Sequence, residues 1–447
     1  MTELKTYYQL IPEKVYNNLK TIEDLLRPDI KGYSTDNLKE IISIVACHVR
    51  KEDGPAPLSM WHINKLVPQG QFYLTGLINL DVITRSGQFI PKAKICYKYD
   101  FAPEYLSKYK TIPLDNAKLI RRIELVYDRQ RKESSKALRG HNEQTRFLKM
   151  LTIDDAYKEY LNSNYINGTD QYNSILASAI RVINKSHIPS IDNTSGRYHS
   201  VITNMGKGLR PYLRIKGEPL VNIDVKNCQP YLSTIILTDP SKVSYMTTNP
   251  AFALLLQNLK YNDTEDVKKY IYLVASGQLY EYLMQEFNLT RDETKIQVLR
   301  ILFARNRMPK DEVNRKCRLI FKDRFPTVHK IFSKVRGHNK GDKFQNFKRF
   351  AILLQRIESY LMLDVILKRI YKELPGTIAV TIHDSIMTGI LTNNVEAVRK
   401  IMIDELTSFV GFSPKIKIER ISKDKEEEER EEIILNQYDI TNLASYN

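Results

Sequence analysis

Two aspartates at the ends of short apolar strands are the residues best suited to chemistry in this chain. Asp224 lies near the end of a predicted strand over residues 220–225, and Asp384 follows the β-branched run 377–382. A carboxylate at a buried strand end needs a partner, because an unpaired charge that leaves water is unfavourable. Divalent hard cations prefer carboxylate oxygens, so the pair predicts one shared metal site. Either aspartate alone is also consistent with an ordinary strand-to-turn residue.

The segment 290–304, which lies between the two aspartates, favours the metal site. In a helix, Arg291 and Lys295 are one turn apart, and Phe303 lies further along a nearby face. Two cations and an aromatic ring on one side of a helix suit a triphosphate and a base. A nuclease that used the two aspartates would have no evident use for this helix, so a nuclease is the weaker interpretation.

Five segments within residues 195–390 resemble, in order, the motifs of family A DNA polymerases and their relatives, the single-subunit phage-type RNA polymerases. No segment is specific alone, but five in the same order are hard to obtain by chance. The segments are Gly196-Arg197 with Asn204 and Arg210; Asp224; Arg291, Lys295 and Phe303; residues 321–328; and Gln355 with His383, Asp384 and Ser385.

The resemblance implies an α+β fold that is mostly helical, with the palm, fingers and thumb of a right-hand polymerase. The pattern at the start of the chain adds a winged-helix-like domain. The expected regions are 1–105 for the winged-helix-like domain, 106–194 for a helical thumb-like region, 195–239 for the first part of the palm, 240–345 for helical fingers, and 346–447 for the second part of the palm with a C-terminal tail.

The resemblance also implies roles for individual residues. Asp224, Asp384 and the Val225 carbonyl would bind two Mg²⁺ ions, which Mn²⁺ can replace, and Lys295 would bind the phosphates and protonate the leaving pyrophosphate. Arg291 would bind the γ-phosphate through its forked donors. The other expected contacts are Phe303 and Gln229 with the nucleotide, and Arg197, Asn204, Arg210, Gln355 and His383 with the primer-template. For His383, an ordinary turn histidine is an equally good interpretation.

Two departures from the family pattern concern the choice of sugar. The DNA polymerases usually have Glu where this chain has Gln229, and both branches have Tyr where it has Phe303. A Gln is nearly as long as a Glu and still crowds the sugar C2′. A Phe cannot hydrogen-bond a 2′ hydroxyl. Together the two residues favour deoxynucleotides, with imperfect discrimination.

The expected function is therefore primer-dependent DNA synthesis by a monomer that binds primer-template duplex and nucleoside triphosphates. The residues before Gly196 are too few for the family's usual proofreading exonuclease, and a phage, plasmid or mobile-element replication role follows by analogy. Two alternatives stay open. One is a primer-independent RNA polymerase or primase on the same palm, and the other is a non-catalytic DNA-binding replication initiator.

Composition supports a polyanionic partner. The 447 residues carry a net charge of +16 with a pI near 9.3. Residues 291–350, which include the cationic helix, contain 18 Lys and Arg but only 6 Asp and Glu. The four cysteines have no zinc-ligand spacing, and no apolar run is long enough to span a bilayer. We expect a cytoplasmic protein that does not bind membranes.

The first hundred residues predict three helices, over 37–50, 60–66 and 72–80, followed by a hairpin over 82–99. That order is typical of a winged helix, a duplex-binding module, and the hairpin cations Arg85, Lys92 and Lys94 favour binding. A small helical domain that only packs on the rest is the alternative. Further helices are predicted over residues 1–30, 119–131, 144–161, 172–184 and 347–372, and a final strand over 414–421.

Overall fold

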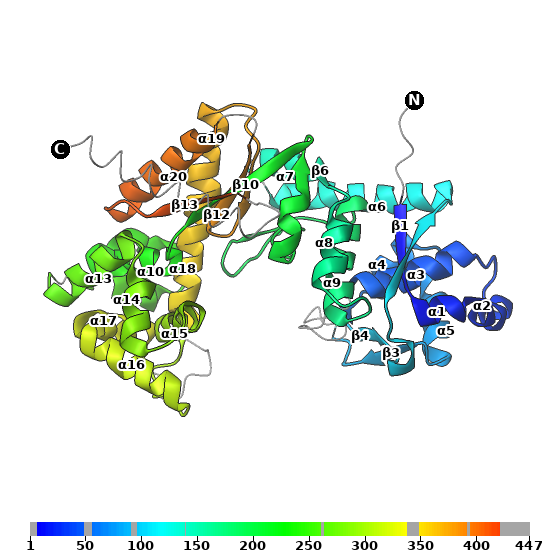
Figure 1. The fold of residues 1–447 in the computed structure, drawn as a ribbon, viewed down its shortest axis with the longest axis horizontal. Helices are drawn as coiled ribbons and strands as arrows, with labels where there is room; N and C mark the ends of the chain where they lie inside the picture. Colours follow the sequence, from blue (N-terminus) through cyan, green and yellow to red (C-terminus); the bar gives the residue numbers. More distant parts are fainter. Residues whose placement is uncertain are drawn as a thin grey trace. The chain divides into compact units, whose positions relative to one another are not determined.

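The chain forms two compact units, and each is described here by itself (Figure 1). The structure is a computed structural model that describes residues 7–48, 56–90, 96–138, 140–260, 263–337, 348–390 and 394–420. Unit 1 contains residues 1–139, 148–190 and 200–217, and unit 2 contains residues 140–147, 191–199 and 218–447. The five regions expected from the sequence are defined by their roles in a polymerase, whereas the two units are defined by packing. The units therefore do not test the five regions, which stay predictions.

Unit 1 begins with a strand where the sequence predicts only helix. Strand β1 (Tyr7–Pro12) pairs antiparallel with β5 (Tyr109–Leu114). The helix expected over residues 1–30 is therefore wrong at β1, although α1 (Glu13–Asn17) and α2 (Leu19–Leu26) follow it. A partner about a hundred residues away decides the strand, because β structure depends on cross-strand context more than on local preference.

Three helices follow, as the sequence predicts, and the two strands of the predicted hairpin belong to a sheet of three. The helices are α3 (Thr35–His48), α4 (Met60–Leu66) and α5 (Gly70–Asn79). The sheet has the order β2-β4-β3, with β2 at Ala56–Pro57, β3 at Ile83–Ser86 and β4 at Lys98–Phe101. The hairpin cations Lys92 and Lys94 lie outside the described residues. Binding of a duplex by this module stays a prediction.

The helix predicted over residues 144–161 is wrong. The chain forms α7 (Asn142–Lys149), then strand β6 (Leu151–Ile153), then α8 (Tyr157–Asn164). Strand β6 pairs with β9 (Leu213–Ile215), about 60 residues away, and this long-range pairing overrides the local helix preference. The neighbouring predictions are confirmed by α6 (Ala117–Ala137) and α9 (Asp170–Ile183).

Unit 2 contains four antiparallel strands in the order β11-β12-β10-β13. Their bounds are Glu218–Val225 for β10, Ala379–Ile382 for β11, Ser385–Gly389 for β12 and Ile416–Arg420 for β13. All residues of β11 and β12 are buried, and β10 is nearly so, which agrees with their apolar, β-branched sequences. The three strands predicted in this part of the chain are thus confirmed.

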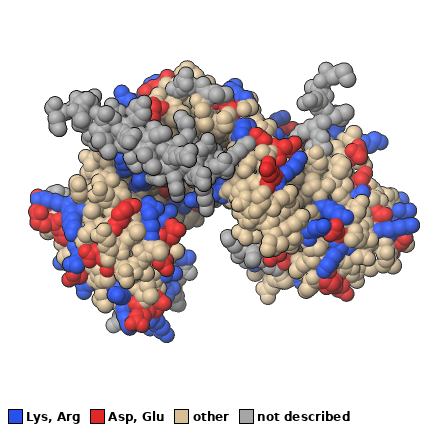
Figure 2. Space-filling view, in the orientation of Figure 1, with Lys and Arg blue, Asp and Glu red and all other residues tan. Residues whose placement is uncertain are grey.

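The described chain from the end of β10 to residue 337 is helical, as expected. Its α-helices are α10 (Cys228–Ser233), α11 (Ile235–Thr238), α12 (Pro250–Gln257), α13 (Glu265–Ala275), α14 (Leu279–Phe287), α15 (Arg291–Phe303), α16 (Glu312–Arg324) and α17 (Pro326–Arg336). On the face shown in Figure 2, the Lys and Arg of this helical group are interspersed with Asp and Glu.

One long helical run joins this helical group to the sheet (Figure 1). It consists of α18 (Arg349–Ser359), a π-helical stretch (Tyr360–Ile366) and α19 (Leu367–Glu373), which confirms the helix predicted over 347–372. Short π-helical insertions are frequently found at functional sites. Helix α20 (Val395–Val410) follows the hairpin. None of the helices in the described ranges is both long enough and apolar enough to cross a membrane.

A buried glutamate ties β1 to α3 in the core of unit 1. The Glu40 carboxylate accepts hydrogen bonds from the Tyr7 hydroxyl at 3.0 Å and the Gln9 amide at 2.9 Å. Burial raises the pKa of Glu40 to about 7, although both hydrogen bonds favour the ionised form. The folded protein therefore binds this proton more tightly than the unfolded chain does.

We expect the stability contribution of Glu40 to be complete below about pH 4.5 and to be lost as the pH rises to about 7. A shift of this size is worth about 3 kcal/mol. The free energy of unfolding of the wild type, relative to Glu40→Gln, should fall by about that amount between pH 4.5 and 8. Urea unfolding followed by fluorescence measures this change, because the chain's single tryptophan, Trp61, lies in unit 1.

The same substitution at the exposed Glu159 is the control and should show no such trend. Parallel pH profiles for wild type and Glu40→Gln would contradict the assignment.

Candidate active site

The two strand-end aspartates lie at the same end of the sheet of unit 2. In the β10–β12 ladder, Asp224 is opposite Ser385, the residue that directly follows Asp384. On its other side Asp224 is opposite Lys417 of β13. Residues opposite each other on antiparallel strands have Cα atoms about 4.5–5.5 Å apart. The register therefore brings Asp384 next to Asp224, from a position 160 residues further along the chain.

Asp384 is positioned by a tight hairpin turn. Ile382 of β11 pairs with Ser385 of β12, so His383 and Asp384 form a two-residue loop. His383 adopts a φ of +54°, which is uncommon for a residue with a side chain. Its ring lies 6.0 Å from that of His199, with the two planes at 71°. This turn places a histidine and a carboxylate together at the sheet end.

A buried ion pair lies beside the sheet end. Glu358, the penultimate residue of α18, accepts from Nε and Nη2 of Arg197, each at 2.8 Å, and its side chain is 1% exposed. The Gln229 amide donates to the same carboxylate. Burial and the nearby Asp384 raise the pKa of Glu358 to about 7, against the lowering effect of Arg197 and Gln229.

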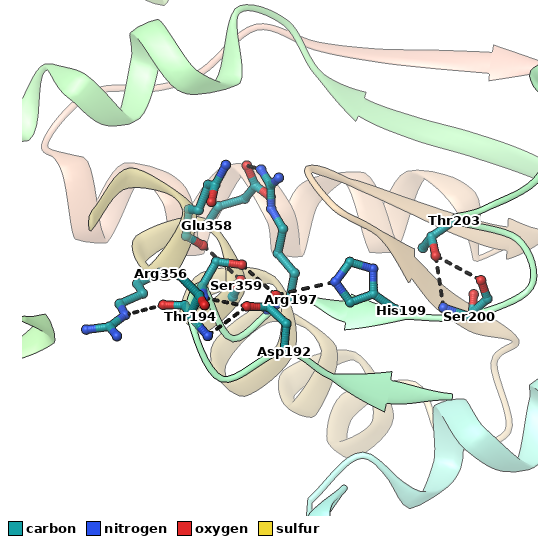
Figure 3. A network of polar contacts seen from close by, with 11 residues as sticks. Asp192, Thr194, Arg197, His199, Ser200, Thr203, Arg356, Glu358 and Ser359 are labelled. Carbon is teal, nitrogen blue, oxygen red and sulfur yellow. Dashed lines mark hydrogen bonds and ion pairs between the residues drawn. The ribbon is translucent and has the colours of Figure 1, made fainter. Parts of the chain in front are cut away.

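The loop 191–199, which carries Arg197, is organised around Asp192 (Figure 3). This carboxylate accepts from the backbone N–H groups of Thr194, Ser195 and Arg197, from the Ser195 hydroxyl, and from His199. Partial burial opposes ionisation, but the hydrogen bonds, led by those from Ser195, lower the pKa of Asp192 to about 2. Gly196 completes the loop with a φ of +73°, a conformation that favours glycine.

Arg356 joins the same loop to α18. Its guanidinium donates to the carbonyl of Thr194 at 2.7 Å (Figure 3). It also donates to the carbonyl of Met246 at 3.0 Å. Glu358 and Arg356 thus connect α18 to the loop from two sides. The position of Arg197 follows from these contacts and not from the residues next to it in the chain.

The thiol of Cys228, the first residue of α10, is buried and is affected by the charges of three carboxylates. Burial raises the pKa of this thiol, and Asp384, Glu358 and Asp224 raise it further. Nearby Asn227 is buried at a φ of +56°, and neither of its amide atoms has a hydrogen-bond partner among the described residues. Within the same residues, no group of three or more His, Cys, Asp and Glu forms a metal-ligand cluster. A metal here would use two carboxylates and other oxygens.

Helix α15 begins beside Tyr280 of α14. Its N-terminus is a capping box, in which Thr290 and Glu293 satisfy each other's backbone N–H groups. The Arg291 guanidinium carbon lies 5.7 Å from the centre of the Tyr280 ring and Nε lies 3.1 Å from Glu281. Burial raises the pKa of the Tyr280 phenol, which also responds to Cys228, Arg291 and Asp384.

The remaining predicted residues divide between the two units. Lys295 is exposed on α15, and Phe303, at the end of that helix, packs against Phe350 with ring centres 6.4 Å apart. Gln355 lies one turn before Glu358 on α18. Asn204 and Arg210 belong to unit 1, and their contact with a primer-template stays a prediction.

Sequence reasoning missed Glu358, Asp192 and Asn227. Glu358 had one available signal, since an acidic residue three positions after Gln355 lies on the same face of a helix. Asp192 also had a signal in the sequence, because an aspartate followed by Asn, Thr, Ser and Gly is typical of a side-chain-stabilised turn. Nothing in the sequence indicates that Asn227 is buried without partners.

Comparisons with known proteins do not identify a family. No family model matches the chain, and no curated protein matches it. Among solved structures, it is similar to the POL domain of Pol1 from M. smegmatis in complex with DNA primer-template and dNTP, with a TM-score of 0.30 and 9% identity. The match covers 93% of this chain and 67% of that one. At so low a TM-score the likeness supports neither a shared fold nor a shared function.

We expect the Arg197–Glu358 pair to be strongly coupled. Removing one partner of a buried ion pair typically costs about 3–5 kcal/mol, whereas replacing both by apolar residues costs far less. In a double-mutant cycle, Arg197→Met with Glu358→Met should therefore be less destabilised than the sum of the single variants. Urea unfolding followed by circular dichroism measures the coupling.

The exposed pair Lys158–Asp155, at 2.8 Å, provides the matched control. Its coupling should stay below about 0.5 kcal/mol, because exposed ion pairs contribute little. Equal coupling energies for the two pairs would refute the structural role of Glu358.

Proposed function

We propose that unit 2 catalyses template-directed nucleotidyl transfer, and that its reaction is DNA synthesis from a primer. The observation that carries the proposal is the register that sets Asp384 beside Asp224 at one sheet end. The charge of Asp384 also acts on Glu358, the partner of Arg197, and on Tyr280, which lies beside Arg291 at the start of α15. This combines paired carboxylates, which suit divalent cations, with exposed cations, which suit phosphates.

The donor set fits magnesium. Mg²⁺ is usually bound through one or two carboxylates and keeps several waters, so Asp224, Asp384 and the Val225 carbonyl are sufficient ligands. When bound, a pair of such ions activates the attacking hydroxyl and neutralises the triphosphate charge. The unpartnered amide of Asn227, three residues after Asp224, is a further polar group available to a ligand or to water.

Helix α15 would bind the incoming nucleotide. Arg291 would exchange its ion pair with Glu281 for the γ-phosphate, a small loss because both side chains are about half exposed. Lys295, one turn later, would bind the adjacent phosphate oxygens and donate a proton to the leaving pyrophosphate. Phe303 would lie against the base or the sugar.

Other residues of unit 2 would bind the primer-template. Nε and Nη2 of Arg197 donate to Glu358, so Nη1 would bind a phosphate or a base edge. Gln355 and His383 would add neutral donors and acceptors beside it. Contacts to the backbone and to minor-groove edges suit an enzyme that must accept any sequence.

Both aspartates should be required for catalysis. We expect Asp224→Ala and Asp384→Ala each to reduce primer extension in Mg²⁺ by at least a hundredfold, because a lost metal ligand removes several kcal/mol of transition-state stabilisation. Binding of the primer-template should stay within a few fold of wild type. Asp323→Ala, at a 75% exposed aspartate on α16, is the matched control and should extend normally. Near-normal extension by either site variant would remove the metal-site assignment.

The choice of sugar should depend on Gln229 and Phe303. Because Glu358 holds the Gln229 amide, the side chain is fixed in place, and Gln229→Ala should open space at C2′ and increase ribonucleotide use. Phe303→Tyr adds one hydroxyl, and a hydrogen bond made with only one substrate is worth about 0.5–1.5 kcal/mol, or roughly three- to tenfold in selectivity. The ratio of kcat/KM for dNTPs and rNTPs measures both effects.

The sign of the Phe303→Tyr effect separates the two leading functions. In a DNA polymerase, the new hydroxyl would bond the Gln229 amide and sharpen deoxynucleotide preference. In an RNA polymerase-like site, it would bond the 2′ hydroxyl instead. A shift towards ribonucleotides, together with a neutral Gln229→Ala, would overturn DNA synthesis in favour of RNA synthesis.

A further inference from the structure

A strongly basic groove lies in unit 1, where the proposed chemistry assigns nothing. It has a volume of about 780 Å³ and is lined by α4, α6 and the N-terminal end of α3. Its charged lining consists of Lys65, Lys118, Arg121, Arg122 and Arg129, with Glu133 as the single acid. On the face of unit 1 shown in Figure 2, positive and negative side chains are mixed. The lining of the groove differs, because all but one of its charged residues are basic.

The cations of α6 form a stripe along one face of the helix. Lys118, Arg121 and Arg129 are separated by three and eight residues, so they lie on one side, and all three are exposed. Among the described residues, no acidic side chain pairs with any of them. Asn116 caps the same helix by accepting from the Leu119 N–H, and the positive end of the helix adds to the field. Three available cations in a row suit successive phosphates.

Arg122 has a different, structural task. Its Nε donates to the Lys65 carbonyl at 2.9 Å and its Nη2 donates to the Asn64 carbonyl at 3.0 Å. These carbonyls are at the C-terminal end of α4, where a cation is favourable. A hydrogen bond of 2.8 Å between the Gln130 amide and the His62 ring joins the same two helices. The two sides of the groove are therefore fixed to each other within unit 1.

An exposed tryptophan adjoins the groove. Trp61 is 64% exposed, and Lys65, which lines the groove, has its Nζ 3.2 Å from the centre of the indole ring. A single exposed aromatic residue is no evidence of a site by itself, but this indole lies beside the basic groove and most of its surface is accessible to a ligand. Aromatic rings beside a basic groove are the surfaces on which unpaired bases stack, and the bases of a duplex are not available for such stacking.

We propose that this groove binds single-stranded nucleic acid, with phosphates on Lys118, Arg121 and Arg129 and a base on Trp61. The cations favour any polyanion, and the exposed indole selects one that carries flat, unpaired rings. All residues of this groove belong to unit 1, and none of them is assigned to the proposed active site. A strand bound here would be held by the same chain that copies nucleic acid in unit 2.

The chain contains its own probe, because Trp61 is its only tryptophan. We expect a 20-nucleotide oligo(dT), titrated into the full-length protein, to quench the fluorescence in a saturable, salt-dependent manner. Arg121→Ala with Arg129→Ala should weaken binding at least tenfold at 0.1 M salt. The same double variant should reduce the log–log salt slope by about 1.4, since each phosphate contact to a single strand contributes about 0.7.

Controls separate the groove from general charge. Lys20→Ala with Lys31→Ala removes two exposed cations elsewhere on unit 1 and should change the affinity less than twofold. Trp61→Ala, assayed by anisotropy of a labelled oligo(dT), should weaken binding about tenfold, as expected for one lost stacked base. Because Trp61 and the altered arginines are exposed, thermal midpoints of these variants should match wild type.

Three results would overturn the proposal. They are unchanged Trp61 fluorescence at saturating oligo(dT), equal affinity of the Arg121→Ala/Arg129→Ala variant and wild type, and a 20-base-pair hairpin duplex that quenches as tightly as the single strand. Failure here is distinguishable from failure of the proposed activity. A protein that extends primers without quenching overturns only the groove, and one that quenches without extending primers overturns only the nucleotidyl transfer.

Discussion

The buried carboxylate of Glu358 is the group on which the architecture of the candidate site depends. It receives two hydrogen bonds from Arg197 and one from Gln229, and thereby joins α18, the loop 191–199 and the start of α10. Burying a carboxylate is unfavourable unless it is paired and hydrogen-bonded, and Glu358 is both, whereas Arg197 keeps partial contact with water. Glu358 is the acceptor that holds the side chains of both Arg197 and Gln229 in this arrangement.

The pKa of Glu358, raised to about 7 by burial and by Asp384, indicates how crowded the site is with negative charge. The same crowding acts on the Cys228 thiol. Such a cluster is costly in the free protein, and a divalent cation or another positively charged ligand would offset it. The carboxylates that raise these two pKa values include the pair proposed to bind a metal.

The two units would treat nucleic acid by different physical means. In unit 2, the candidate site combines carboxylates, a histidine-containing turn and the exposed cations of α15, which suit the reacting ends of a primer and a nucleotide. In unit 1, the groove beside α6 has cations and an exposed indole but no paired carboxylates, which suits binding without chemistry. The net charge of +16 is consistent with both, but it locates neither.

The sequence by itself determined the elements whose patterns are local. The strand around Asp224, the strand that precedes Asp384 and the helix from Arg291 to Phe303 all follow from β-branched runs and residue spacing. Only the tertiary structure decided the features that depend on partners distant in sequence. Strand β1 and strand β6 exist because of pairings about 100 and 60 residues away, which outweigh local helix preference. Glu358 matters because folding removes its carboxylate from water beside Arg197, and no local pattern encodes that burial.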